Sequence, residues 1–144
     1  MSIVIHELGH AVAARILEAE ETELSIGIGK KIGSLKAAGI QVNFHICYFL
    51  GGLAQSRRRE PFTDREKVWV SFAGPLASAT ISLLAGLYLP VTDSNEYLRL
   101  FFLFNLWLAA INIIPFKVRG KETDGYIILT IIKKCRSLSK YKHR

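Results

Sequence analysis

Long uncharged stretches alternate with short charged ones along this chain of 144 residues. Residues 68–92 and 100–116 contain no Asp, Glu, Lys or Arg. As a helix rising about 1.5 Å per residue, the first stretch is long enough to cross roughly 30 Å of hydrocarbon, and the second is just long enough. Residues 3–20 are apolar up to an acidic end and predict a third, shorter helix. The pattern predicts a mainly α, polytopic membrane protein with about three membrane helices.

The region between the first two predicted helices has a different pattern. Residues 24–29 and 40–50 contain two β-rich runs, and a stretch rich in Lys and Gly separates them. They predict a small β-hairpin. Gly27 and Gly29 alternate with isoleucines, so the first strand would have one nearly bare face and backbone groups available to another chain. An ordinary surface hairpin is the alternative.

The C-terminal part contains the second uncharged stretch, which predicts the last membrane helix, and a shorter helix follows it. The helix over about 97–114 ends at Pro115, which has no backbone N–H to donate. A polar loop over 116–123 follows, and an apolar helix too short to span a membrane begins at Asp124. The length is that of one domain, so we expect residues 1–144 to form a single domain.

Basic residues are distributed unevenly, and the formal net charge is +7. Lys and Arg number eight in residues 18–68, nine in 117–144 and none in 91–97. Nucleic acid would suit such a charge, but membrane proteins acquire basic residues in their cytoplasmic loops. The asymmetry therefore predicts that 18–68 and the C-terminal tail are cytoplasmic, that 91–97 lies outside, and that nucleic acid is not a partner.

Two histidines and a glutamate interrupt the apolar run at the start of the chain. His6 and His10 are four residues apart, so on a helix their rings lie on one face, as two ligands of one zinc ion require. Glu7 is adjacent and completes the H-E-x-x-H pattern of metalloproteases, in which the glutamate is the general base. The alternative, a pair of core histidines with a buried glutamate, is disfavoured because an uncompensated Glu at mid-bilayer costs at least about 2.5–3.5 kcal/mol.

A catalytic zinc site needs a third protein ligand and an open position for water. His45 lies in an apolar predicted strand, where packing is the more common role, and His143 lies in the terminal tail. Asp124 is the better candidate, because it begins a helix just after Asn112 and Pro115. A helix N-cap is the alternative role for Asp124.

Four motifs in this order resemble the site-2 proteases, which are intramembrane zinc metalloproteases. They are HELGH at residues 6–10, a glycine-punctuated hairpin (LSIGIGKK…FLGGLA), AGPLAS at 73–78, and NIIPFKVRGKETDGY at 112–126. The resemblance covers nearly the whole chain. Two departures are a longer link between Asn112 and Asp124 than in many members, and Ser78 at a position that is often Asn.

The resemblance implies roles for individual residues. His6, His10 and Asp124 would bind one Zn²⁺ ion, Glu7 would be the base, and Asn112 would position the substrate or stabilise an oxyanion. Four glycines would belong to a membrane-associated hairpin that pairs with the backbone of a membrane-protein substrate: Gly27, Gly29, Gly51 and Gly52. The protein would be integral to a membrane, and a bacterial cell membrane is expected.

The sequence therefore predicts a zinc metalloendopeptidase that cleaves transmembrane or membrane-associated substrates. A catalytically inactive relative that keeps zinc as a membrane scaffold or regulator is the alternative. A soluble thermolysin-like protease shares H-E-x-x-H, but the two uncharged stretches argue against it. Because few residues precede His6 on a helix that should cross the membrane, we expect the natural chain to begin upstream of Met1.

Overall fold

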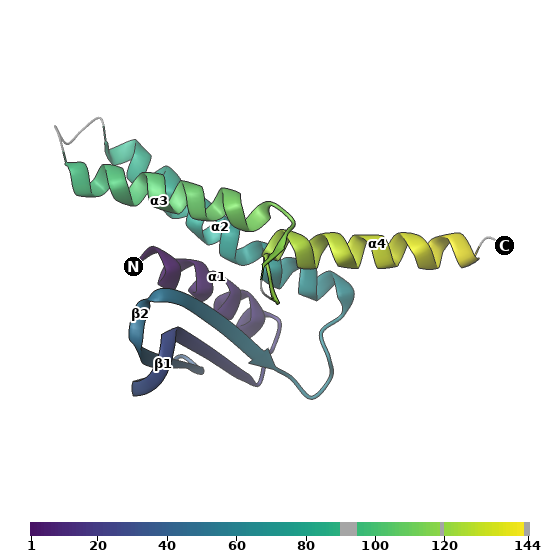
Figure 1. Cartoon of the computed structure of the whole chain (residues 1–144). Helices are drawn as coiled ribbons and strands as arrows, with labels where there is room; N and C mark the ends of the chain where they lie inside the picture. Colours follow the sequence, from purple (N-terminus) through teal and green to yellow (C-terminus); the bar gives the residue numbers. More distant parts are fainter. Residues whose placement is uncertain (90–94, 119, 143–144) are drawn as a thin grey trace.

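The computed structural model describes residues 1–89, 95–118 and 120–142, apart from the side chains of 48–50 and 138–142. Within these residues the fold is mostly helical, with four helices and a small sheet (Figure 1). In chain order the elements are α1 (Ser2–Ile16), β1 (Glu21–Ala37), β2 (Ile40–Arg57), α2 (Asp64–Tyr88), α3 (Glu96–Ile113), β3 (Lys117–Val118), β4 (Lys121–Glu122) and α4 (Asp124–Lys142). His143 and most of the predicted turn at 91–97 lie outside the described residues.

The helix α2 contacts both α1 and α3 and holds them together (Figure 1). Small side chains recur about every four residues on its buried face and let the neighbouring helices approach closely: Ser71, Gly74, Ser78, Ser82 and Ala85. The partner surface on α1 is equally bare, because a Cβ added to Gly9 would lie 2.5 Å from the carbonyl oxygen of Ala73. The first helix therefore packs on α2 almost backbone to backbone.

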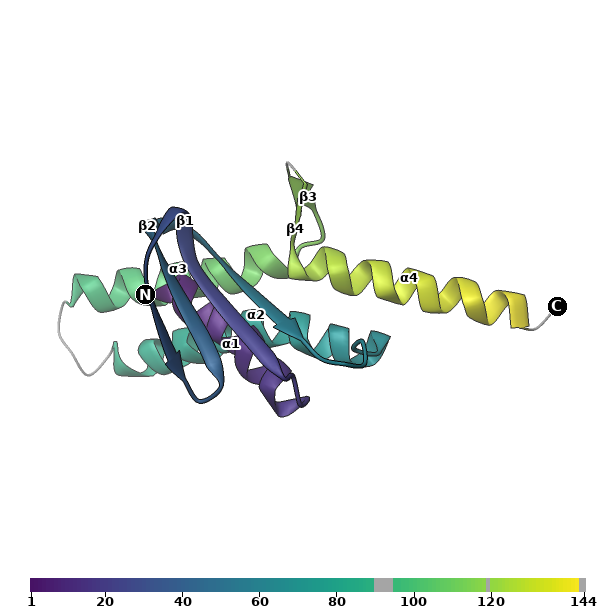
Figure 2. The same cartoon turned by 90° about the horizontal axis from the view of Figure 1, so that it is seen from below.

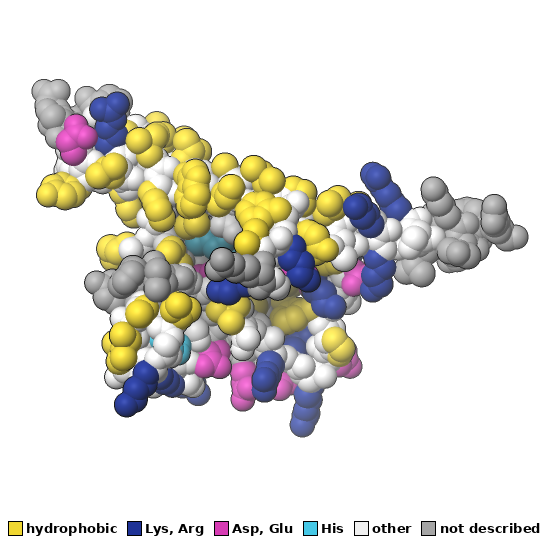
Figure 3. Space-filling view, viewed as in Figure 1, with side chains coloured by type: hydrophobic (Ala, Val, Ile, Leu, Met, Phe, Trp, Pro, Cys, Tyr) yellow, Lys and Arg dark blue, Asp and Glu magenta, His cyan; other side chains and the backbone are white. Residues whose placement is uncertain are grey.

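Two of the helices, α2 and α3, are long and apolar enough to cross a membrane. Large apolar side chains of α3 point outward, and Trp107 and Leu100 are 56% and 63% exposed. Figure 3 shows hydrophobic side chains gathered along these helices, whereas Lys and Arg gather over the sheet and α4. The third predicted membrane helix, α1, has 15 residues and is shorter than the roughly 20 that a span needs.

The sheet is made of two long, bent strands with more than one register. Residues 22–26 pair with 52–56 in antiparallel order on one side. On the other side residues 22–26 pair with 40–44 in parallel order, from Thr22 with Ile40 to Ile26 with Phe44. Residues 31–37 form one edge of the sheet and 52–57 form the other, because within the described part of the chain each of these runs has pairing partners on one side alone. The inner face packs on α1 (Figure 2).

Three predictions about local structure are wrong in detail. The first helix ends at Ile16 and not near residue 20, because Glu18 has a φ of 62° and the chain turns into β1. Gly27 and Gly29 do not continue a regular strand, because their φ values of 88° and 97° bend β1 in a way that glycine alone tolerates without strain. The loop predicted over 116–123 contains the hairpin formed by β3 and β4.

Candidate metal centre

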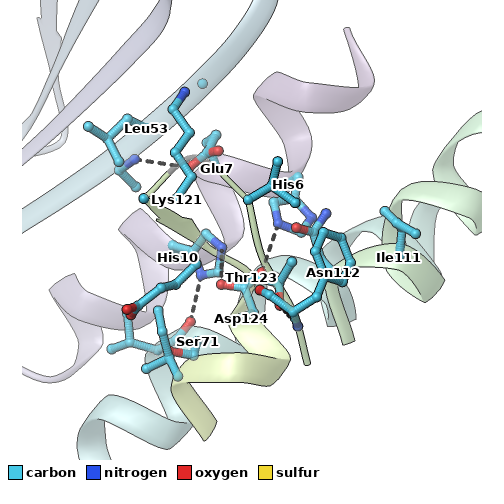
Figure 4. A pocket seen from close by; sticks show the side chains of 18 of the residues that line it. His6, Glu7, His10, Leu53, Ser71, Ile111, Asn112, Lys121, Thr123 and Asp124 are labelled. Carbon is cyan, nitrogen blue, oxygen red and sulfur yellow. Dashed lines mark hydrogen bonds and ion pairs between the residues drawn. The ribbon is translucent and has the colours of Figure 1, made fainter. Parts of the chain in front are cut away.

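Two histidines of α1 and the first residue of α4 come together at one point (Figure 4). The ring centroids of His6 and His10 are 5.0 Å apart. Asp124 Oδ2 lies 3.2 Å from His6 Nε2, and Asp124 Oδ1 lies 3.4 Å from His10 Nε2. One potential ligand atom from each residue lies within 4.8 Å of the others, and the described part of the chain contains no second group of this kind. The structure thus brings together the three residues that the sequence predicts as zinc ligands.

The outer nitrogen of each histidine ring is held by α2. His10 Nδ1 donates to the carbonyl oxygen of Val70 at 2.7 Å. A carbonyl oxygen only accepts, so Nδ1 carries the proton and Nε2 of a neutral His10 ring keeps its lone pair. His6 Nδ1 lies 3.0 Å from Oγ of the fully buried Ser78, so this hydroxyl is positioned to accept from Nδ1 when His6 has the same tautomer as His10. Both Nε2 atoms then face Asp124, in a position where they could bind a metal ion.

The donor set fits zinc. Two Nε2 atoms and a carboxylate at these distances are stabilised by a cation between them, which is either a proton or a metal ion. Ligands about 2.0–2.1 Å from a tetrahedral zinc ion are separated by about 3.3 Å. The two N–O distances, each to a different oxygen of Asp124, are 3.2 and 3.4 Å, and one ligand atom from each of the three residues lies within 4.8 Å of the others. Hydrogen bonds from the distal ring nitrogens to Val70 and Ser78 are the outer partners that metal-ligating histidines usually have.

Thr123, and not Asp124, caps the start of α4. The Thr123 hydroxyl accepts from the backbone N–H of Tyr126 at 3.3 Å and from that of Phe116 at 3.2 Å, and it donates to the carbonyl oxygen of Ile114 at 2.8 Å. The N-cap alternative for Asp124 is therefore wrong. Because the neighbouring hydroxyl satisfies the helix end, the Asp124 carboxylate is left to face the histidines.

Glu7 lies beside the three-residue group and faces the edge of β2. Its Oε2 accepts from the backbone N–H of Ala54 at 2.9 Å. A Cβ added to Gly52 would lie 2.6 Å from Glu7 Cγ, so this strand approaches closely because the position has no side chain. The contact holds the Glu7 carboxylate at the rim of the site, one residue along α1 from His6.

A cavity of about 970 Å³ opens beside these side chains. Its walls come from α1, the 52–54 edge of β2, α2, α3, the β3–β4 hairpin and the start of α4. Asn112 lines it, but its side-chain N–H donates to the carbonyl oxygen of Leu108 at 2.9 Å, within its own helix. Gly52 lines the cavity, whereas Gly27 and Gly29 do not. His45, on β2, is outside the three-residue metal group.

Three features of the site could not be found from the sequence. Val70 contributes through its backbone, which any residue offers. Ser78 is one of several small residues on α2, and nothing in the chain marks it as the one that contacts His6. Gly74 leaves the space that the His10 ring occupies, since an added Cβ would overlap that ring. The AGPL motif around Gly74 is the one signal that could have pointed to it.

The charged groups at the cavity rim come from the β3–β4 hairpin. Lys117 Nζ and Glu122 Oε1 form an ion pair at 2.7 Å, and this hydrogen bond raises the pKa of the Lys117 ammonium. Glu122 lines the cavity, and its negative charge is compensated by the ion pair with Lys117. Lys121 also lines the cavity, and its ammonium has no hydrogen bond or ion pair with any residue that the structure describes.

Comparison with known proteins identifies the family of this chain. The family model of peptidase family M50 matches residues 1–94, which include His6, Glu7 and His10. A Thermotoga maritima protein named "Putative zinc metalloprotease" is 34% identical over 104 residues, which cover 62% of this chain and 20% of that protein. The chain thus spans about a fifth of the length of this curated relative. Since the family match covers about two thirds of the chain, the protein belongs to peptidase family M50, the site-2 protease family.

Proposed function

We propose that this protein is an intramembrane zinc metalloprotease that cleaves transmembrane or membrane-associated substrates. The observation that carries the proposal is the convergence of His6, His10 and Asp124 within 4.8 Å, with both histidines turned toward the aspartate by α2. These three residues would hold one zinc ion. A carboxylate, Glu7, stands next to this group and lines the same cavity.

The chain's own residues would perform the proton transfers of peptide hydrolysis. Zinc, when bound, would supply Lewis acidity and make a water molecule nucleophilic near neutral pH. Glu7 would accept the proton of the attacking water and pass it to the leaving amine. The Ala54 N–H would orient the Glu7 carboxylate before the reaction. Asn112, which lines the cavity, would stabilise the developing oxyanion once its amide turns away from Leu108.

The substrate would bind in extended form along the outer edge of β2. Residues 52–57 pair with β1 on one side. On the other side the Ala54 N–H donates to Glu7, and the remaining backbone groups are available to a further strand. Gly51 and Gly52 lie at the start of this edge, and Gly52 lines the cavity. A helical substrate hides its peptide groups in hydrogen bonds, and pairing with this edge would replace those bonds. Gly27 and Gly29 would act indirectly, by bending β1.

The membrane arrangement follows from the same elements. We place α2 and α3 across the bilayer and α1 within it as the third helix, packed on α2. The basic residues of 18–68 and of the C-terminal tail support a cytoplasmic position for these regions. The site would be reached by water from that side.

The test compares cells that express the wild-type protein, a Glu7→Gln variant or a Glu60→Gln variant. Quantitative proteomics of the membrane fraction should show membrane proteins that are shortened by the wild type and accumulate intact with Glu7→Gln. Glu60 is exposed and does not line the cavity, so Glu60→Gln is the matched control and should behave as wild type. Identical membrane proteomes for the wild type and Glu7→Gln would refute the protease function.

Zinc content separates a protease from an inactive relative. The purified wild-type and Glu7→Gln proteins should each contain one zinc ion per chain, whereas His6→Ala and Asp124→Ala should contain much less. One zinc ion per chain without any difference between the two membrane proteomes would favour the zinc-binding scaffold. Full zinc content in Asp124→Ala would show that another group is the third ligand.

A further inference from the structure

The β3–β4 hairpin carries an uncompensated positive charge at the cavity. Lys117 pairs with Glu122 across the hairpin, and Val118 pairs with Lys121. Residues directly opposite each other in an antiparallel pair lie on the same face. One face of the hairpin is therefore neutralised by the 2.7 Å ion pair, and the other presents an apolar side chain beside a lysine.

The position of Lys121 relative to the candidate site is known from two observations. Lys121, Val118 and Glu7 all line the same cavity. In the view of Figure 4 the Lys121 side chain lies between those of Leu53 and Glu7, on the side of the pocket that β2 forms. The Lys121 ammonium nevertheless forms no ion pair with the carboxylate of Glu7 or Asp124. A ligand group can therefore lie between the lysine and the site.

The other charged groups at the cavity already have partners. The histidines and Asp124 face one another, Glu7 accepts from Ala54, and Glu122 is paired with Lys117. Among the described residues that line the cavity, Lys121 is the one Lys or Arg, and its ammonium has no partner. An ammonium without a partner at a cavity wall favours binding of a ligand whose anionic group can accept its hydrogen bonds.

We propose that Lys121 is a specificity-determining residue that binds a carboxylate of the peptide substrate, with Val118 contacting the apolar part of the same residue. The inference rests on the proposed function and names one chemical feature of its substrate. The carboxylate could be an acidic side chain near the scissile bond or the C-terminal carboxylate of a peptide. The chemistry of the contact is the same in both cases, and the experiment separates them.

The experiment measures peptide binding and not cleavage. The probe is a fluorescein-labelled decapeptide of Leu, Ala and Gly that carries one Asp, placed at each position in turn, with twins that carry Asn or Lys instead. Each peptide is made with a free and with an amidated C-terminus. Fluorescence anisotropy in detergent gives the Kd of each peptide for the zinc-loaded Glu7→Gln protein. This variant lacks the proposed base, so we do not expect it to cleave the peptide.

We expect the best Asp peptide to bind about tenfold more tightly than its Asn twin. In Lys121→Gln the difference should disappear, and in Lys121→Glu the Lys twin should bind best. A simple loss of structure would weaken all twins and could not reverse their order. Lys133→Glu changes the net charge by the same amount at an exposed site outside the cavity, and it should leave the preference for Asp unchanged.

Each outcome decides the proposal. A preference that depends on the position of Asp and survives amidation identifies an acidic side chain as the ligand. A preference that amidation removes identifies a C-terminal carboxylate. Equal binding of all twins, an unchanged order in Lys121→Glu, or no binding of any peptide overturns the proposal. If Lys121 controls the charge preference but the wild-type protein cleaves nothing in the proteome comparison, the protease function is refuted. Lys121 then remains a residue that binds a peptide carboxylate.

Discussion

Replacement of Ser78 by alanine would remove the partner of His6 without altering any metal ligand. Ser78 is fully buried on α2, and its Oγ lies 3.0 Å from His6 Nδ1. Alanine is the better helix former and is smaller by one oxygen atom, so α2 should keep its structure. The change therefore tests whether this contact orients the histidine ring for the metal.

The expected loss can be estimated from the burial of the contact. Without Ser78 Oγ, the Nδ1–H of His6 has no acceptor in a buried site, which costs about 1–3 kcal/mol. Loss of such an outer partner of a metal-ligating histidine usually weakens metal binding about tenfold to hundredfold, or about 1.4–2.7 kcal/mol. The two estimates agree, so we expect the Kd for zinc to rise by a factor within this range in Ser78→Ala.

Competition with a chromophoric chelator, in detergent at fixed pH, measures the zinc affinity. Ser82→Ala is the matched control. Ser82 is one helical turn further along α2, is equally buried, and donates to the carbonyl oxygen of Phe102 at 2.9 Å. It contacts α3 and not the site, so its zinc affinity should stay within twofold of wild type. Equal zinc affinity in Ser78→Ala and wild type would refute the orienting role of the Ser78 hydroxyl.

Three further changes test other parts of the site. Gly74→Ala should reduce zinc content, because the added methyl group overlaps the ring of His10. Gly86→Ala is the matched control. Its added Cβ would lie 3.0 Å from the Phe102 ring, away from the site, so the protein should keep its zinc content even if α2 and α3 move slightly apart. Thr123→Ala should lower the free energy of unfolding by about 1–2 kcal/mol in a detergent-denaturation titration, and Thr123→Ser, which keeps the hydroxyl, should recover most of it. A zinc chelator should abolish the cleavage that depends on Glu7, and added zinc should restore it.

The parts of the site that the sequence predicted are those encoded by local spacing. His6, Glu7 and His10 lie within five residues of one helix, so the period of the helix alone sets their relative positions. The two long uncharged stretches likewise indicate α2 and α3 without any knowledge of packing. The sequence predicts Asp124 as a ligand but keeps a helix cap as the alternative, because Asp124 and the adjacent Thr123 are equally good capping residues. Which of the two side chains satisfies the helix end depends on the path of the chain before it.

The remaining features depend on contacts between distant segments or on backbone angles. Ser78 is 72 residues from His6, and Val70 is 60 residues from His10. Alternation predicted a regular strand at Gly27 and Gly29, yet glycine in an alternating pattern is also the residue that permits a bend. The β3 and β4 strands have two residues each, which is too short for any periodicity.

The polar contacts that orient the site also hold α1 in place. Ser2, His6 and His10 are spaced four residues apart on one face of this helix. Ser2 Oγ accepts from the buried Asn105 of α3 at 2.9 Å, and the two histidines contact Ser78 and Val70 of α2. In a bilayer, burial of apolar surface does not drive helices together, and interhelical hydrogen bonds contribute about 0.6 kcal/mol each on average, so these three would contribute roughly 2 kcal/mol. A helix as short as α1 can thus be fixed against α2 by the same hydrogen bonds that orient the nitrogens proposed to bind zinc. Weakening one of these two bonds should therefore affect the docking of α1 together with the affinity for zinc.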